Sequence, residues 1–419
     1  MEKLPLQKNN RKQINHKADI CMNSILEEIE KLSFTQPQTI PEREEWKETV
    51  QEVKKIIEKK ADASLVNKEP VEFLLDSDEI PEDRFYADVK SAHLECFFKR
   101  GTADYLVVFL SGARTRSDGV APYPTFSSWS WYKDINASLL CIDDPMYNTY
   151  PDMVVGLYYG TETDDYRQDT AVLIKKIAQL LGIENKHIIL YGRSGGGPSA
   201  VAMSDYIKGS CTCTVNGQYD TPNFPYTVEE FAKFSKIDVK TDENFKKRDD
   251  VAGIIKRNPE NTYLFITNIF SAKDANNSIP YFKKHFDFDH KYGIAQSENA
   301  FFWTYSAWGV SDAHNSFDSV SIFKMIFEIV IGLSNGMSVD KANILAMSVN
   351  DFWFERYNHL IKRKQYENQI SELNTELSAS KEEIETLKKQ VSVLNESFGN
   401  RLSRAFKRLL NKIRHKKKT

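Results

Sequence analysis

The sequence predicts an α/β fold, in which a mainly parallel β-sheet carries helices on both faces. Continuous apolar runs at 105–110, 137–142 and 188–191 have the composition of strands that are buried on both sides. Helical patterns separate such runs, most clearly from about Asp165 to Leu181, and this alternation is typical of parallel sheets. With 41% hydrophobic residues among 419, the chain can build one such domain together with appendages.

The composition divides the chain into five segments. Residues 1–65 are charged and predict a helical extension without a catalytic cluster. Residues 70–335 predict the catalytic domain. Besides the runs above, we expect its strands at 71–75, 85–98, 212–216, 263–268 and 301–306, a helix stop at Gly182 and a closing helix at 316–333. The remaining segments are a helical connector at 336–364, a coiled coil at 365–396 and a basic amphipathic tail at 399–419.

A strand, a tight turn and a helix are expected to meet around Ser194. The pattern Gly192-x-Ser194-x-Gly196 describes a nucleophile elbow, in which a serine sits on a strained turn and small neighbours avoid clashes with the strand and the helix. A plain glycine-rich loop could carry the same pattern. The apolar strand before the turn and the helical stretch to about Lys208 favour the elbow, so Ser194 is the predicted nucleophile.

A serine hydroxyl needs a base within hydrogen-bond reach and a third group that orients the base. In an elbow-type α/β fold, the acid and then the base follow the nucleophile along the chain. Asp274 comes directly after the strand expected at 263–268, and His314 comes after the strand expected at 301–306. We therefore predict that Ser194, Asp274 and His314 act together.

Each partner of the serine has a competitor. Asp220 and Asp312 are alternative acids, and His314 could be a helix residue without chemistry. His285 and His290 could mimic a metal cluster, but a charged, aromatic surface loop explains them better, so no metal site is expected.

The oxyanion formed in acyl transfer needs two convergent backbone N–H donors. Gly195 would supply one because it follows the nucleophile. We expect the other from the loop after 105–110, with Ala113 as first choice and Gly112 as second, since small residues let the backbone come close.

Cationic and aromatic residues beside these motifs are candidates for substrate binding. Arg114, Arg116 and Arg193 would give the pocket a positive rim suited to a phosphorylated sugar or coenzyme A, unless they are ordinary solvated arginines. Trp129 lies among the aromatic residues of 126–132, which could stack on sugar faces or form a lid; a core cluster is the other explanation.

The motifs FLSGA at 109–113, YGRSGGG at 191–197 and SDAH at 311–314 resemble those of the α/β-hydrolase fold. More narrowly, they resemble bacterial capsular polysaccharide biosynthesis proteins of the XcbB/CpsF kind, and they are similar to capsule O-acetyltransferases that use this fold with acetyl-coenzyme A. The resemblance implies Ser194 as acyl-accepting nucleophile, His314 as general acid and base, and Asp274 as its orienter.

The expected activity is therefore acyl transfer, most simply of acetyl, to a capsular or other cell-surface polysaccharide. Acetyl-coenzyme A would be a co-substrate, and no tightly bound cofactor is expected. Two alternatives stay open: an esterase or deacetylase that acts on glycan intermediates, and a non-catalytic scaffold of a capsule-synthesis complex.

From Tyr366 onward, apolar residues recur with the spacing of a coiled coil. We call these positions the heptad seam; its a positions are Ile370, Leu377, Ile384 and Val391, and its d positions are Leu373, Ser380, Leu387 and Leu394, of which only Ser380 is not apolar. β-Branched residues at a with leucine at d favour a parallel homodimer. The alternative is a lone helix that packs back on the body.

The tail after Gly399 has nine lysine and arginine residues and no acidic residue, whereas the rest of the chain is acidic. Leu402, Phe406 and Leu409 share one helical face, which predicts an amphipathic helix on an anionic membrane surface. Binding of nucleic acid or of an acidic polymer is the alternative, but a single basic segment argues against general nucleic-acid binding.

The compartment is expected to be reducing. The five cysteines form no disulfide or metal-ligand pattern, and neither a signal-peptide core nor an apolar span is present. We expect a cytoplasmic protein that is peripheral on the inner face of the cell membrane.

Overall fold

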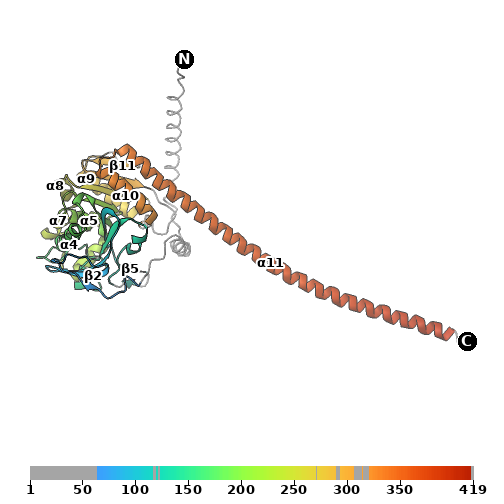
Figure 1. The fold of residues 1–419 in the computed structure, drawn as a ribbon. Coiled ribbons are helices and arrows are strands. Elements are labelled where there is room, and N and C mark those ends of the chain that lie inside the picture. The colour runs from blue at the N-terminus through green and yellow to red at the C-terminus, as the bar shows by residue number, and fades with distance from the viewer. Residues whose placement is uncertain are drawn as a thin grey trace, which may run out of the picture. The chain divides into compact units, whose positions relative to one another are not determined.

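The computed structural model describes residues 64–116, 119–120, 123–269, 271–288, 293–305, 314 and 320–416 (Figure 1). The helical extension expected over 1–65 lies almost entirely outside the described residues. The chain divides into two compact units, Met1–Phe354 and Glu355–Thr419. The first unit is called the body below.

Within the described residues of the body, ten strands form one sheet in the order β1-β2-β3-β7-β4-β8-β9-β10-β12-β11. Their bounds are β1 Val71–Glu72, β2 Asp83–Val89, β3 Ala92–Lys99, β4 Ala103–Leu110, β7 Ala137–Ile142, β8 Ile188–Arg193, β9 Cys211–Val215, β10 Thr262–Asn268, β11 Gly293–Ser297 and β12 Ala300–Tyr305. A separate two-stranded ladder joins β5 Thr115–Arg116 to β6 Gly119–Val120.

The direction of the strands identifies the fold class. From β7 through β4, β8, β9 and β10 to β12, neighbouring strands are parallel. Strand β3 is antiparallel to both β2 and β7, and β11 is an antiparallel edge strand. Taken from β2 to β12, this is the strand order of the α/β-hydrolase fold, with its antiparallel second strand. The predicted fold class is confirmed.

The helices of the body are α3 Met146–Thr149, α4 Tyr166–Leu181, α5 Gly196–Ser204, α6 Pro225–Phe234, α7 Glu243–Arg248, α8 Val251–Arg257, α9 Ala272–His285 and α10 Val320–Ser334, with 3-10 turns η1 Trp129–Lys133, η2 Asn185–His187 and η3 Thr221–Asn223. Helix α4 has the predicted bounds. The Asp165 side chain caps its first turn, and Gly182 ends it with φ 69° in the left-handed region.

Both faces of the sheet are covered, which explains the continuous apolar runs. Alternate residues of β4 and β8, such as Val108 and Leu190, pack with Ile174 of α4 on one face. Their neighbours, such as Phe109 and Tyr191, pack with Phe323 of α10 on the other. Helices α4, α5 and α8 lie on the first side and α10 on the second (Figure 1).

The segment 85–98 differs from the prediction, because it forms two strands and not one. Strands β2 and β3 make a hairpin that turns at Lys90, whose φ is 50°. The residues that face the core under α4 occupy odd positions up to Val89 and even positions from Ala92 onward, and this change of phase is the signal of the turn. Smaller differences are β1, which covers only Val71–Glu72 of the strand expected at 71–75, the edge strand β11, which was not predicted, and the end of α5 at Ser204, before Lys208.

The C-terminal segments are joined in one long helix, α11 Val339–Lys416, which runs through Gly399. The predicted connector, coiled coil and tail are therefore parts of one element. Ala342, Ala346 and Val349, at the start of α11, are buried in the core beside α10. Among the described residues, no helix is both long and apolar enough to cross a membrane.

Candidate active site

The chain around Ser194 has the geometry of a nucleophile elbow. Strand β8 ends at Arg193, α5 begins at Gly196, and Ser194 between them has φ 52°, a strained value for a residue with a side chain. A Cβ on Gly192 would lie 2.0 Å from the carbonyl oxygen of Gly196, and one on Gly196 would lie 2.7 Å from that of Leu110. Only glycine fits at either position, because the strand and the helix approach so closely.

Asp274 and His314 are brought together as predicted. The Nδ1 atom of His314 lies 2.7 Å from Oδ2 of Asp274, whose carboxylate is fully buried. Asp274 lies in the first turn of α9 and not in a loop, and the hydroxyl of Ser271 donates to the same Oδ2. Of the competing acids, Asp220 accepts from the side chain of Asn223, and Asp312 lies outside the described residues.

Asn216 links His314 to the elbow. The main-chain carbonyl of Val215, the last residue of β9, accepts from the N–H of Ser194 at 3.2 Å. The next residue, Asn216, donates from Nδ2 to the carbonyl oxygen of His314 at 2.6 Å, and its Oδ1 accepts from the N–H of Asn268 at 2.8 Å. The main chain of His314 thus lies at the carboxyl end of β9, the strand that pairs with both β8 and β10. Asn216 was not predicted from the sequence.

Gln218 is a second residue near Ser194 that was not predicted from the sequence. Its Nε2 lies 3.4 Å from Oγ of Ser194, and its main-chain N–H donates to the carbonyl of Ser194 at 3.3 Å. The Thr227 hydroxyl donates to its Oε1 at 3.3 Å, which orients the amide so that the NH₂ group faces the serine. Its position just after a parallel strand was the available signal.

The loop expected to form the oxyanion hole lies against the elbow. A Cβ on Gly112 would be 2.9 Å from the carbonyl oxygen of Arg193 and 3.7 Å from the nitrogen of Gly195. A Cβ on Gly195 would be 4.0 Å from the nitrogen of Ala113. The backbone N–H groups of Ala113 and Gly195 are therefore neighbours.

Tyr147 fixes the orientation of this loop. Its hydroxyl lies 3.1 Å from the carbonyl oxygen of Gly112 and 2.9 Å from that of Val154. Across a trans peptide the C=O and the following N–H point in opposite directions, so the N–H of Ala113 points away from Tyr147. The N–H of Arg114 donates to Val154 at 2.8 Å and holds the other end of the turn.

Two buried carboxylates support the loop from behind. Asp143 accepts from the hydroxyl of Ser111 and from the N–H of Thr125. Asp144 accepts from the N–H groups of Met146 and Tyr158 at 3.0 and 2.9 Å. Burial raises the pKa of both carboxyls, that of Asp144 to about 7, although their hydrogen bonds act in the opposite direction.

No protein-family model and no curated protein matches the chain.

Solved structures do match, at low sequence identity. The capsule O-acetyltransferase of Neisseria meningitidis serogroup A is 17% identical with a TM-score of 0.40, over 59% of this chain and 94% of that chain. The acylaminoacyl peptidase of Pyrococcus horikoshii is 15% identical with a TM-score of 0.43, over 62% of this chain and 43% of that chain. A Glycosylation Associate Protein (Gap123) complex from Streptococcus agalactiae is 14% identical with a TM-score of 0.37; the match covers 54% of this chain and spans 42% of that chain.

The likeness is one of fold. At these values it assigns no activity or substrate to this chain.

The predicted positive rim is only partly present. Arg114 is buried, donates to the carbonyls of Pro151 and Met153, and stacks 4.1 Å over the ring of Tyr147. The expectation that it lines an exposed rim is therefore wrong, because its guanidinium braces the loop from inside. Arg193, beside the nucleophile, is half-buried, and the side chain of Arg116 lies outside the described residues.

The aromatic residues at 126–132 form a core cluster. Phe126 and Trp131 are buried, and Trp129 is half-buried with its ring edge-on to Phe97 at 5.6 Å. Trp131 packs against Phe323 of α10. Of the two explanations, the core explanation holds for this segment, and a lid built from it is not supported.

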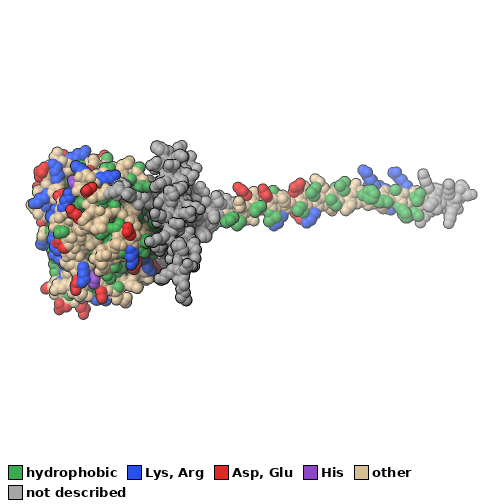
Figure 2. All heavy atoms as spheres, turned by 90° about the horizontal axis from the view of Figure 1, so that it is seen from above, with side chains coloured by type: hydrophobic (Ala, Val, Ile, Leu, Met, Phe, Trp, Pro, Cys, Tyr) green, Lys and Arg blue, Asp and Glu red, His purple; other side chains and the backbone are tan. Residues whose placement is uncertain are grey.

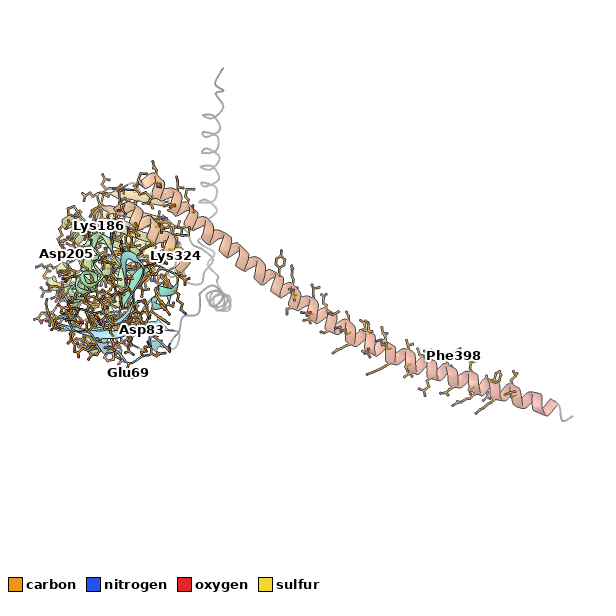
Figure 3. The ribbon with its side chains drawn as sticks, viewed as in Figure 1. Glu69, Asp83, Lys186, Asp205, Lys324 and Phe398 are labelled. Atoms are coloured by element: carbon orange, nitrogen blue, oxygen red, sulfur yellow. The ribbon has the colours of Figure 1, made fainter. Side chains whose placement is uncertain are left out.

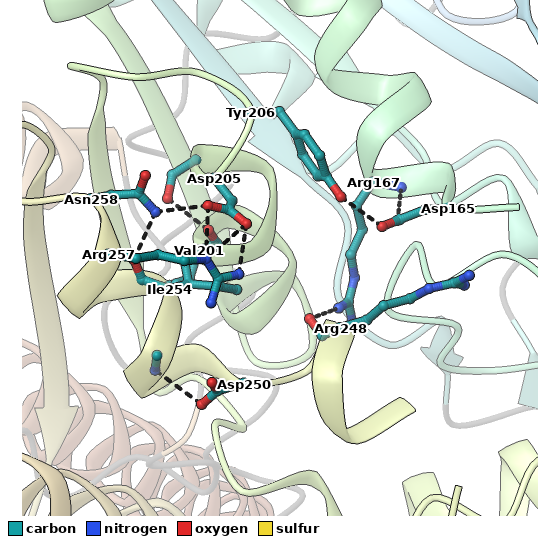
Figure 4. A network of polar contacts seen from close by, with 12 residues as sticks. Asp165, Arg167, Val201, Asp205, Tyr206, Arg248, Asp250, Ile254, Arg257 and Asn258 are labelled. Atoms are coloured by element: carbon teal, nitrogen blue, oxygen red, sulfur yellow. Dashed lines mark hydrogen bonds and ion pairs between the residues drawn. The ribbon is translucent and has the colours of Figure 1, made fainter. Parts of the chain in front are cut away.

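A large cavity lies elsewhere in the body. It has a volume of about 1050 Å³ between α4, α5, α7 and α8, and its lining does not include Ser194. Figure 4 shows the polar network beside it. Arg257 pairs with Asp205 at 2.6 Å, and the hydroxyl of Tyr206 donates to Asp165 at 2.9 Å. Because these charged and polar groups bind one another, we interpret the network as a structural one that holds the helices together.

Metal ligands are not clustered in the described part of the chain, where no group of three or more histidine, cysteine, aspartate or glutamate residues could hold an ion. His285 is at the end of α9, and His290 lies outside the described residues.

Proposed function

We propose that this protein catalyses acyl transfer through an acyl-serine at Ser194, with His314 as general base and acid and Asp274 as its orienter. The observation that supports the proposal is the 2.7 Å hydrogen bond between Asp274 and His314, whose main chain binds Asn216 beside the strand that pairs with β8. Nucleophile, base and orienting acid are the three parts that serine-based acyl transfer requires.

The proposed steps follow from this arrangement. Because the carboxylate of Asp274 accepts a hydrogen bond, Nδ1 of His314 carries a proton and Nε2 is the basic nitrogen. Oγ of Ser194 attacks the carbonyl carbon of the acyl donor while its proton passes to Nε2. The N–H groups of Ala113 and Gly195 stabilise the oxyanion, the leaving group departs with the proton from Nε2, and an acyl-serine remains.

In the second half, His314 deprotonates an incoming hydroxyl. This oxygen attacks the acyl carbon, and collapse of the oxyanion returns the proton to Oγ of Ser194. We propose a sugar hydroxyl of a capsular or other cell-surface polysaccharide as acceptor and acetyl-coenzyme A as donor. This choice rests on the sequence motifs at 109–113, 191–197 and 311–314.

A serine-reactive fluorophosphonate probe tests the nucleophile. We expect the wild type to be labelled, Ser194→Ala to stay unlabelled, and His314→Ala to react at least about 100-fold more slowly, since a general base contributes that much. Ser235→Ala is the control, because Ser235 is a helix-end serine that donates to the carbonyl of Phe231. An unlabelled wild type would favour the non-catalytic scaffold.

Acetyl-coenzyme A with and without purified polysaccharide separates transfer from hydrolysis. For a transferase, polysaccharide speeds release of coenzyme A and becomes acetylated. If thioester cleavage is the same without polysaccharide and no acetyl appears on the polymer, the protein is a hydrolase, the esterase alternative.

We also propose that residues 399–416 of α11 bind an anionic membrane surface, which would make the protein peripheral on the inner face of the cell membrane. Leu402, Phe406 and Leu409 are exposed and share one side of the helix, whereas Arg401, Arg404, Lys407 and Arg408 project from the other side. Figure 2 shows hydrophobic and basic side chains on different sides of this end of the helix. Apolar burial and attraction to acidic lipids then act together.

Co-sedimentation with vesicles tests the tail. We expect binding to phosphatidylcholine vesicles that contain phosphatidylglycerol and not to phosphatidylcholine alone. Leu402→Ser with Phe406→Ser should abolish binding, whereas Val393→Ser, another exposed apolar position of the same helix, should not. Equal sedimentation of all variants would refute membrane binding by the tail.

A further inference from the structure

The heptad seam of α11 has no cover within the described chain. Its apolar residues, from Ile370 to Leu394, are between 51% and 67% exposed. Phe398 continues the seam one heptad further and stands out from the helix (Figure 3). Most of the stability of a helix in a protein comes from packing of its apolar face. We therefore expect a partner to cover the exposed heptad seam of this long helix.

The charges beside the seam identify the kind of partner. The g positions of the two central heptads are Glu376 and Glu383, and the e positions that follow are Lys381 and Lys388. In a parallel, in-register pair, each g residue lies beside the e residue five positions later in the partner. Glu376 then meets Lys381, and Glu383 meets Lys388, on both sides of the interface.

The flanking heptads obey the same rule with neutral residues. Gln369 at g would meet Asn374 at e, and Gln390 would meet Asn395. In an antiparallel pair, g faces g and e faces e, so glutamate would meet glutamate or glutamine and lysine would meet lysine or asparagine. Charge complementarity therefore favours the parallel arrangement.

We propose that α11 pairs with the α11 helix of a second copy of this chain, parallel and in register, from about Tyr366 to Phe398. The next two d positions are Arg401 and Arg408, which cannot enter an apolar seam, so the pairing ends before the basic tail. The proposal goes beyond the acyl chemistry and does not depend on it.

The arrangement has a consequence for the tail. Because the two helices run in the same direction, both copies of residues 399–416 lie at the same end of the dimer. Two basic segments would then engage one surface together, which raises their joint affinity without any new contact.

Cysteine cross-linking tests direction and register in the full chain. Leu394→Cys places a thiol at a d position near one end of the seam, where it meets its own copy only in a parallel, in-register dimer. Mild oxidation with diamide should join two chains, whereas Val393→Cys, at an outward c position, should not cross-link. Cross-linking of both variants to the same extent, or of neither, would contradict the proposal.

Charge exchange tests the specificity of the pairing, with mass measured by sedimentation equilibrium. Glu376→Lys with Glu383→Lys should weaken the dimer by about tenfold or more, since attractive pairs become repulsive. Adding Lys381→Glu and Lys388→Glu to the same chain should restore it. Glu382→Lys with Glu396→Lys changes the same charge at outward f positions and should leave the dimer intact.

Any of three results would overturn the proposed pairing. The wild type could be monomeric at micromolar concentrations, the fourfold variant that also carries Lys381→Glu and Lys388→Glu could stay monomeric, or Glu382→Lys with Glu396→Lys could dissociate the dimer as strongly as Glu376→Lys with Glu383→Lys. Ser194→Ala should not change the measured mass. The fate of the dimer and that of the proposed acyl chemistry can therefore be told apart.

Discussion

At Ser194, the backbone holds a non-glycine residue at φ 52°, and glycines on both sides make this possible. Such strain costs about 1–3 kcal/mol and persists only where the surroundings enforce it. Here the enforcing contacts are main-chain atoms: the carbonyl of Gly196 against Gly192, and that of Leu110 against Gly196. Packing of the strand against the helix therefore holds Ser194, which is half-buried, in its strained conformation.

Substitution of Gly192 should therefore be far more damaging than substitution of a glycine in open space. We expect Gly192→Ala to lose about 3 kcal/mol or more, because its Cβ meets backbone. Gly182→Ala, at φ 69° with no atom nearby, should lose only about 1 kcal/mol. Urea denaturation of both variants measures this, and equal losses would contradict it.

Tyr147 is predicted to act through the oxyanion loop. Tyr147→Phe removes the hydroxyl that binds the carbonyl of Gly112 but keeps the ring under Arg114. We expect kcat to fall by about 10-fold to 100-fold with KM little changed, since the N–H of Ala113 loses its fixed orientation. Stability should fall by only about 1 kcal/mol. A lower melting temperature with normal kcat would assign Tyr147 a purely structural role.

At the scale of elements, the end of β7 joins three segments. Asp143 holds the start of the oxyanion loop at Ser111, and Asp144 holds α3 and the turn at Tyr158. Both carboxylates are buried, so their hydrogen bonds to backbone N–H groups are needed to offset the loss of water. Protonation of these two carboxyls is therefore coupled to folding.

The raised pKa of Asp144 predicts a dependence of stability on pH. A carboxyl with a pKa of about 7 in the folded protein and about 3.9 in the unfolded chain stabilises the fold fully at low pH. This contribution is lost as pH rises from about 4 to 7, at up to about 1.4 kcal/mol for each pH unit.

Asp144→Asn should remove that dependence, so the stability advantage of the wild type over the variant should shrink as pH rises through this window. Asp152→Asn removes a charge from an exposed position and serves as the control. A constant difference between wild type and Asp144→Asn from pH 4 to 7 would show that Asp144 is ionised throughout.

At the scale of the whole molecule, α11 belongs to both units. Its first turns bury Ala342, Ala346 and Val349 in the core of the body, and its remainder carries the exposed heptad seam. The boundary at Phe354 separates these two roles.

Truncation of α11 at two positions should separate its role in the core of the body from its role as carrier of the heptad seam. A chain that ends at Phe354 should keep the melting temperature and probe labelling of the body, because the core residues are retained. A chain that ends at Ser338 loses that cover and should be destabilised by about 3 kcal/mol or more, judged from the apolar area exposed. Thermal unfolding compares the two, and equal melting temperatures would contradict a structural role for this part of α11.

The sequence by itself determined the order of the parts. Buried strands show as apolar runs, the elbow shows as spaced glycines, and Asp274 and His314 follow their strands in the expected order. Local patterns of this kind depend on neighbours along the chain. For the same reason, the heptad seam could be read position by position.

Tertiary structure alone decided which side chains meet. Asn216 and Gln218 gained their contacts because parallel strands end at one edge of the sheet, which no local pattern records. Arg114 was predicted at the pocket rim, but its side chain is buried. It binds the carbonyl of Met153 and stacks on Tyr147, which both belong to another segment. Contacts between distant segments depend on the packing of the whole body, and the sequence carries them only indirectly.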